Sequence, residues 1–211
     1  MKTNINKIVK ITIAVAALIF IIVTLAKSGS KEKAVATSPV DPMHAQASVS
    51  AGAVAISDLT GKLTPQFSLQ DRDGVVYTPE SLNGKNVVMF FNEGLMCYPS
   101  CWNQIVALST DARFQGGDTI ALAIVTDKPG DWQQAIAKMP ELGKATTLFD
   151  TDRSVSTAFG MLTAKSSMHY GQLPGHSYVI LDKTGIVRYV FDDPNMAVNN
   201  DRLAEELSKL K

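Results

Sequence analysis

Residues 86–101 read NVVMFFNEGLMCYPSC, and this stretch decides the fold of the chain. Asn86 to Phe91 is an almost continuous apolar run, which is typical of a central strand covered on both faces. A short loop leads to Cys97, and Pro99 favours the first turn of a helix, where its missing N–H is not needed. The pattern predicts a strand, a loop and a helix, with Cys97 at or just before the helix start and Cys101 about one turn inside it.

The same alternation of strand and helix patterns continues along residues 58–211. Asp71–Gly74 and Asp182–Gly185 each end in the glycine of a tight turn, and each is flanked by strand-like residues, so two hairpins are predicted. Asp150 or Asp152 is expected to cap a helix that runs through Phe159. The domain is therefore predicted to be α/β, a three-layer fold with a central mixed sheet. Further strands are expected at 67–70, 75–77, 119–125, 146–149, 176–181 and 186–191, and helices at 99–114, 131–139 and 200–210.

The N-terminal region has a different composition from this domain. Ile11 to Ala26 is uncharged and apolar, and it is bracketed by Lys10 and Lys27. Extended back through Ile8 and Val9, with snorkelling of Lys10, it approaches the length that a bilayer requires of a helix. A cleaved signal peptide would have a shorter apolar region and an A-x-A-like site, whereas Thr24-Leu25-Ala26 is a poor one. We expect an uncleaved transmembrane anchor at 11–26, after a short flank at 1–10 and before a flexible linker at 27–57.

Charge and cysteine content narrow the function classes. Lys+Arg and Asp+Glu number 20 each, so no basic surplus indicates nucleic acid. The chain has two cysteines, Cys97 and Cys101. A thiolate at a helix N-terminus has a lowered pKa, and a spacing of four residues lets the two sulfur atoms approach on one face. The carboxyl end of a central strand is also where α/β proteins place their chemistry. The alternative is that both are small buried apolar residues.

With the cysteines placed on a strand, loop and helix, the domain resembles the thioredoxin-like superfamily. The redoxin branch, which includes the alkyl hydroperoxide reductase and thiol-specific antioxidant proteins, is the most similar. This resemblance implies a thioredoxin fold and thiol chemistry at Cys97. It covers residues 60–211 and rests on 65–71 with Asp73-Gly74, on 82–91, on Cys97 and Cys101, on 148–150 with 158–160, and on 177–187.

The chain departs from the peroxide-reducing members of that branch. Those members place Pro and Thr seven and three residues before the attacking cysteine. Before Cys97 these positions hold Phe90 and Gly94, and before Cys101 they hold Gly94 and Tyr98. The family's Arg at the start of the penultimate strand is also replaced, by a histidine. Peroxidase activity is therefore the less favoured function.

A C-x-x-x-C pair with a histidine is instead similar to the Sco-type copper proteins. In that family two thiolates and an imidazole hold the metal, so the resemblance implies Cys97, Cys101 and His176 as copper ligands. The proline that follows the second cysteine in that family is Trp102 here. Thioredoxins proper use C-x-x-C facing a cis-proline, and the facing position here is His176, two residues after Pro174.

We expect a membrane-anchored thiol–disulfide oxidoreductase whose domain lies outside the cytoplasm. Cys97 would attack a substrate disulfide and Cys101 would resolve the mixed disulfide, with no metal or cofactor. The partners would be protein thiols or disulfides and a thiol electron donor. Pro174, His176 and Trp102 would line the substrate groove. The alternative is a copper-binding chaperone using Cys97, Cys101 and His176; a peroxidase and a non-catalytic interaction domain rank lower. His169 is expected to be solvated, and Met196 to be an ordinary loop residue.

Overall fold

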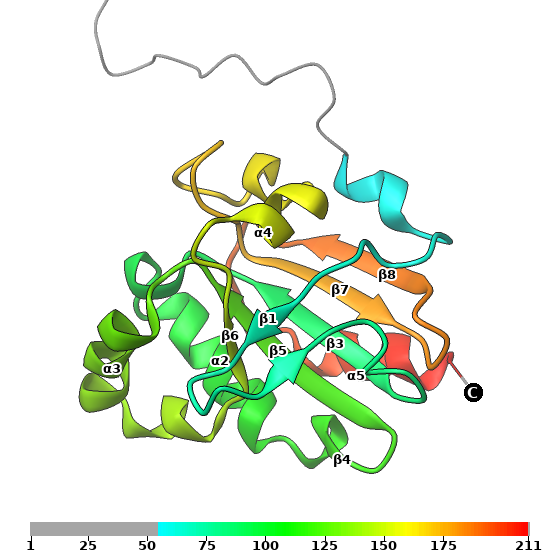
Figure 1. Cartoon of the computed structure of the whole chain (residues 1–211), viewed down its shortest axis with the longest axis horizontal. Helices are drawn as coiled ribbons and strands as arrows, with labels where there is room; N and C mark the ends of the chain where they lie inside the picture. The colour runs from blue at the N-terminus through cyan, green and yellow to red at the C-terminus, as the bar shows by residue number, and fades with distance from the viewer. Residues whose placement is uncertain (1–54, 211) are drawn as a thin grey trace, which may run out of the picture. The chain divides into compact units, whose positions relative to one another are not determined.

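The structure, a computed structural model, describes residues 55–210 (Figure 1). Its main sheet has the strand order β4-β5-β3-β7-β8, and β6 also pairs with β5. A separate two-stranded sheet pairs β1 with β2. The strands are β1 (Leu69–Gln70), β2 (Val76–Tyr77), β3 (Asn86–Phe91), β4 (Gln115–Gly116), β5 (Thr119–Val125), β6 (Thr147–Phe149), β7 (Ser177–Leu181) and β8 (Val187–Asp192).

The predicted central strand is confirmed as β3. It pairs in parallel with β5 and antiparallel with β7, so the sheet is mixed. Its side chains alternate between two buried layers: Val88 and Phe90 lie in one apolar cluster, and Val87, Met89 and Phe91 lie in the other. Because both faces are covered, the strand reads as a continuous apolar run rather than an alternating one.

Helices cover both faces of the sheet, which confirms the three-layer prediction. Helices α2 (Ser100–Thr110), α3 (Pro129–Lys138) and α5 (Asn200–Ser208) contribute to the cluster of Val88 and Phe90. Helix α4 (Ser154–Ala158) contributes Val155 to the opposite cluster, together with Leu69 of β1. Short 3₁₀ turns complete the chain: η2 (Ile56–Leu59), η3 (Gly94–Met96), η4 (Ala112–Phe114), η5 (Pro140–Lys144) and η6 (Met161–Thr163).

Both predicted hairpins form, and both proposed caps of α4 are used. β1 pairs with β2, and β7 with β8, all antiparallel. The carboxylate of Asp150 accepts the N–H groups of Val155 and Ser156, at 3.1 and 2.7 Å. The carboxylate of Asp152 accepts the N–H of Ser154 at 2.9 Å. These bonds satisfy donors that a helix N-terminus leaves without partners.

The helix predicted over 99–114 is shorter than expected. It ends at Thr110, and Asp111 adopts an extended backbone with φ −86° and ψ 117°. The carboxylate of Asp111 then accepts the N–H of Arg113 at 3.0 Å, which starts the separate turn η4. Short polar side chains such as Asp compete with the helix for backbone N–H groups in this way, and apolar periodicity does not reveal the competition.

Within residues 55–210, no helix has both the length and the apolar character that a membrane crossing requires. The predicted anchor at 11–26, the flank at 1–10 and nearly all of the linker at 27–57 lie outside the described residues.

Candidate active site

Asn92 fixes the chain where it leaves β3. Its Nδ2 donates to the carbonyl oxygens of Phe90 and Ile124, both at 3.3 Å. Its Oδ1 accepts the N–H of Gly94 at 3.0 Å. The side chain is fully buried, so each of these bonds forms away from water. The loop that leads to Cys97 therefore begins from a single, well-defined position.

Gly94 occupies a position that admits no side chain. Its φ is +59°, and a Cβ placed there would lie 1.7 Å from Oδ2 of Asp127. The same oxygen accepts the N–H of Leu95 at 3.0 Å, and the carbonyl of Gly94 accepts the indole N–H of Trp102 at 3.0 Å. Burial raises the pKa of Asp127. A threonine three residues before Cys97, as in the peroxide-reducing pattern, is sterically excluded in this arrangement.

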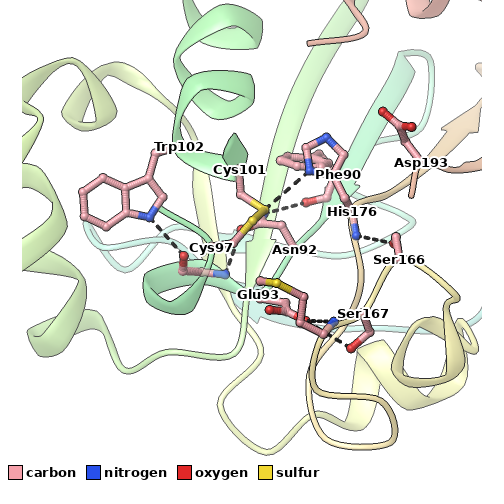
Figure 2. Close-up of a disulfide and its surroundings, with 12 residues drawn as sticks. Phe90, Asn92, Glu93, Cys97, Cys101, Trp102, Ser166, Ser167, His176 and Asp193 are labelled. Carbon is pink, nitrogen blue, oxygen red and sulfur yellow. Dashed lines mark hydrogen bonds between the residues drawn. A yellow bond between two sulfur atoms is a disulfide. The ribbon is translucent and has the colours of Figure 1, made fainter. Parts of the chain in front are cut away.

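Cys97 and Cys101 form a disulfide, with 5.3 Å between their Cα atoms (Figure 2). The N–H of Cys101 donates to the carbonyl of Cys97 at 3.0 Å, so one helical turn brings both sulfur atoms to one face. Cys97 lies just before α2, as predicted, whereas Cys101 is the second residue of that helix rather than a turn inside it. The two residues are buried, at 3% and 1% exposure. The peptide bond between Tyr98 and Pro99 is cis.

The imidazole of His176 faces this disulfide. Its Nδ1 lies 3.5 Å from Sγ of Cys101. Its Nε2 lies 2.7 Å from the hydroxyl oxygen of Tyr178 and 3.1 Å from the carbonyl oxygen of Ala197. A carbonyl oxygen can only accept, so the Ala197 contact assigns the ring proton to Nε2. Nδ1 then presents its lone pair to the sulfur.

Burial makes this histidine neutral at pH 7. Removal of the ring from water lowers the pKa of His176 to about 4, against the opposing effects of the Ala197 carbonyl and the carboxylates of Asp193 and Asp192. The ring of Phe90 packs edge-on against it, with 4.6 Å between ring centroids. Burial also raises the pKa of Tyr178, which keeps that hydroxyl protonated. The site therefore holds a neutral imidazole next to sulfur.

Glu93 is a buried carboxylate next to the site, outside the reacting groups, and sequence reasoning missed it. Its side chain is 1% exposed, and its Oε2 lies 3.1 Å from Nδ1 of His169. The expectation that His169 is solvated is therefore wrong: this half-buried ring pairs with a buried carboxylate. One signal was available, since an acidic residue two positions after the end of a buried strand needs a partner if it is buried as well. The partner lies 76 positions along the chain, and no spacing rule identifies it.

The other two predicted groove residues, Trp102 and Pro174, are buried. Trp102 is 3% exposed and packs edge-on against the rings of Tyr98 and Trp132. Pro174 is buried in the loop before β7. Met196 is half-buried and packs against the apolar cluster that contains the cysteines. A groove formed by Pro174, His176 and Trp102 stays a prediction.

The three residues of the copper hypothesis do meet in space. One donor atom each from Cys97, Cys101 and His176 lies within 4.8 Å of the other two. With the disulfide reduced, this set would offer two thiolates and one imidazole, which is a donor set that suits copper.

Solved structures share this fold. AhpC of Enterococcus faecalis aligns with a TM-score of 0.61 and 16% identity, over 72% of this chain and 91% of that chain. The structure of MTB dsbF in its mixed oxidized and reduced forms aligns with a TM-score of 0.53 and 27% identity, over 72% of this chain and 100% of that chain.

Sequence comparison gives the family. Peroxiredoxin Bcp of Escherichia coli strain K12 is 32% identical over 145 residues, which is 67% of this chain and 90% of the relative. A model of the Redoxin family matches residues 59–206, a range that contains both cysteines, Glu93 and His176. The chain therefore belongs to the redoxin family and is a thiol-based oxidoreductase.

Proposed function

We propose that the chain is a membrane-anchored thiol–disulfide oxidoreductase that works outside the cytoplasm with Cys97 and Cys101 as its redox couple. The observation that carries the proposal is the disulfide itself, next to the neutral imidazole of His176 at 3.5 Å. A disulfide so close to a strand–helix junction gives the chain a two-electron couple without a cofactor.

The geometry supports a two-step exchange. In the reduced protein, the thiolate of Cys97 attacks one sulfur of a substrate disulfide, and the other substrate sulfur leaves as a thiolate. Cys101 then transfers its proton to Nδ1 of His176, and its thiolate attacks Sγ of Cys97. The bond between Cys97 and the substrate breaks, and the second substrate thiolate leaves and takes up the proton. The substrate gains two electrons and the Cys97–Cys101 disulfide forms.

His176 is suited to the second step by its tautomer. Because Nε2 is held by Tyr178 and Ala197, the free lone pair of Nδ1 faces Cys101. The thiolate formed by the transfer in turn stabilises the imidazolium, since opposite charges in a buried site attract strongly. The proton therefore moves between two groups that are already in contact.

A peroxide is the second candidate oxidant, because Peroxiredoxin Bcp is among the relatives. Exchange with disulfides ranks higher because Gly94 occupies the position of the peroxide-reducing threonine. A side chain at that position would overlap the carboxylate of Asp127. Copper binding is the alternative function predicted from the sequence, and it is favoured by the approach of one donor atom each from Cys97, Cys101 and His176 to within 4.8 Å of one another. In the reduced protein, those three side chains would hold the ion.

The membrane location is supported by the sequence alone. The apolar run Ile11–Ala26 approaches the length of an anchor and is bracketed by lysines. A cysteine pair connected to such an anchor suits an oxidising compartment, where disulfides persist. Recovery of the N-terminal peptide from the membrane fraction after a high-salt wash would support the anchor, and a soluble product that begins near Lys27 would contradict it.

The exchange function is tested with the reduced full-length chain in detergent. We expect glutathione disulfide to oxidise it to a defined equilibrium, with one disulfide formed per chain. We expect the Cys101→Ser variant to accumulate a mixed disulfide on Cys97, and the Cys97→Ser variant to accumulate none. Rapid oxidation by hydrogen peroxide without reaction with glutathione disulfide would instead favour the peroxidase function.

A further inference from the structure

Glu93 is a buried charge that the exchange chemistry does not use. Its carboxylate receives polar groups from one short segment, Ser167 to His169. Oε1 accepts the N–H groups of Met168 and His169 at 2.6 and 3.1 Å, and it lies 3.1 Å from the hydroxyl oxygen of Ser167. Oε2 lies 3.1 Å from Nδ1 of His169. A single side chain therefore holds three consecutive residues that lie more than 70 positions away.

Ser166, the residue before Ser167, is hydrogen-bonded to His176, which faces Cys101. The hydroxyl oxygen of Ser166 accepts the N–H of His176 at 2.7 Å, and the N–H of Ser166 donates to the carboxylate of Asp192 at 3.2 Å. The hydroxyl of Ser166 also bonds to Asp192. Figure 2 shows Ser166 next to the backbone of His176, and Ser167 next to Glu93. We call residues 166–170 the clamp segment. It connects His176, which faces Cys101, to Glu93, which lies four positions before Cys97.

Large apolar side chains are exposed in the clamp segment and in the residues that flank Cys97. Met168 and Tyr170 of the clamp segment are 59% and 51% exposed. Met96 and Tyr98, which flank Cys97 in sequence, are 60% and 49% exposed. The cysteines themselves are nearly inaccessible, so a substrate must contact these surroundings before its sulfur reaches Cys97. Such side chains suit an unfolded or extended polypeptide with apolar residues near its disulfide.

We propose that Glu93 is a positioning residue for polypeptide disulfides: it fixes the clamp segment next to the Cys97–Cys101 pair, so that Met168 and Tyr170 are held ready to contact the substrate. This inference rests on the proposed thiol–disulfide exchange. A binding surface that is already ordered loses less conformational entropy when the substrate binds. Removal of the carboxylate frees the clamp segment, and the cost falls on polypeptide binding rather than on the transfer between sulfur atoms.

The test compares Glu93→Ala with Glu93→Gln and with Glu141→Ala, an exposed glutamate of η5 that serves as the matched control. Insulin is the polypeptide disulfide and glutathione disulfide the small one. For Glu93→Ala we expect KM for insulin to rise about tenfold, because the residues of the clamp segment must then be ordered when insulin binds. The kcat for insulin and the rate with glutathione disulfide should stay within about twofold.

Glu93→Gln distinguishes positioning from a role of the charge. The amide oxygen of glutamine can accept the N–H groups of Met168 and His169, so we expect KM for insulin near that of the wild type. A Gln variant as impaired as the Ala variant would overturn the proposal, because it would assign Glu93 an electrostatic or proton-transfer role. Equal losses with insulin and glutathione disulfide in Glu93→Ala would overturn it as well.

Hydrogen exchange provides a readout that does not depend on activity. We expect the amides of Met168 and His169 to exchange at least about tenfold faster in Glu93→Ala and to stay protected in Glu93→Gln. Unchanged protection in Glu93→Ala would overturn the clamp. If Glu93→Ala does not fold, Ser167→Ala/His169→Ala removes two contacts and keeps the buried carboxylate paired with backbone; it should raise KM for insulin in the same direction. A wild-type chain that exchanges with neither disulfide contradicts the proposed function, while the exchange of the two amides still tests the clamp.

Discussion

Nδ1 of His176 lies 3.5 Å from Sγ of Cys101, although the two residues are 75 positions apart in the chain. The opposite ring nitrogen is held by Tyr178 and Ala197, so the ring has one orientation. A neutral imidazole in this position can take the proton of the resolving cysteine and does not need to act on Cys97.

Replacement of His176 by alanine should slow resolution rather than attack. General-base catalysis typically contributes about 10²–10⁴-fold, so release of the second substrate thiol should slow by at least about 100-fold at pH 7. At alkaline pH the loss should shrink, because a thiolate then forms without help from the imidazole. Rapid-quench measurement of the mixed disulfide checks both effects. Tyr178→Phe is the control, since the carbonyl oxygen of Ala197 can still accept from Nε2 and hold the ring toward sulfur. A loss that is the same at every pH would contradict the base role.

Acid should destabilise the oxidised protein through the same ring. The pKa of His176 is about 4 in the folded chain, against 6.5 for an ordinary histidine. Between these values the unfolded state binds the proton and the folded state does not, so the stability of the folded state falls as the pH falls. The ring should contribute a loss of about 3 kcal/mol in the free energy of unfolding between pH 7 and pH 4. Urea unfolding of wild type and His176→Gln checks this, and parallel pH curves for the two would refute it.

Gly94 should not tolerate even one added methyl group. Its left-handed backbone and the overlap of a Cβ with the Asp127 carboxylate predict that Gly94→Ala lowers the free energy of unfolding by about 2–5 kcal/mol. Asp127→Ala should recover part of this loss in the double variant, because it removes the overlapping atoms. Gly130→Ala is the matched control, since no atom lies within 4 Å of its added Cβ. Denaturant titration of the wild type, the two single variants and the double variant gives the coupling energy between Gly94 and Asp127. Strictly additive losses would show that the overlap is not the cause.

Copper binding separates the two functions that use His176. If copper is the cargo, His176→Ala should weaken Cu(II) binding by at least about 10–100-fold, the usual cost of losing even an outer partner of a metal ligand. In the proposed exchange function, we expect no tight one-to-one Cu(II) complex in the reduced wild-type chain. Competition titration with Cu(II) is the measurement, because two thiolates alone can hold Cu(I) and would mask the histidine. A tight Cu(II) complex that is lost in His176→Ala would reverse the ranking of these functions.

Local chemistry determined most of the fold directly from the sequence. The apolar run 86–91 became β3 and 119–125 became β5, because strands buried on both faces leave an unmistakable uninterrupted pattern. Turn glycines identified both hairpins, and carboxylates identified the start of α4. The end of α2 was missed because Asp111 competes for backbone N–H groups, and this depends on one side chain rather than on a period.

The sequence alone also identified the two cysteines that the proposed exchange uses. Cys97 and Cys101 are four positions apart at a strand–helix junction, and a local turn is sufficient to join them. The position of His176 opposite them could be inferred only through a family resemblance. The approach of its Nδ1 to Cys101 depends on how β7 pairs with β3, a contact between distant parts of the chain.

Only the tertiary structure decided the surroundings of the disulfide. Nothing local in the sequence connects Glu93 with Ser167–His169, or Gly94 with Asp127, because these pairs form when separate loops meet at one edge of the sheet. A buried carboxylate requires hydrogen-bond donors, but physical chemistry specifies only that they exist, not which segment supplies them. The chain's sequence thus specifies the thiol pair, while the folded arrangement of loops specifies that His176 faces this pair and that Ser167–His169 pack against Glu93.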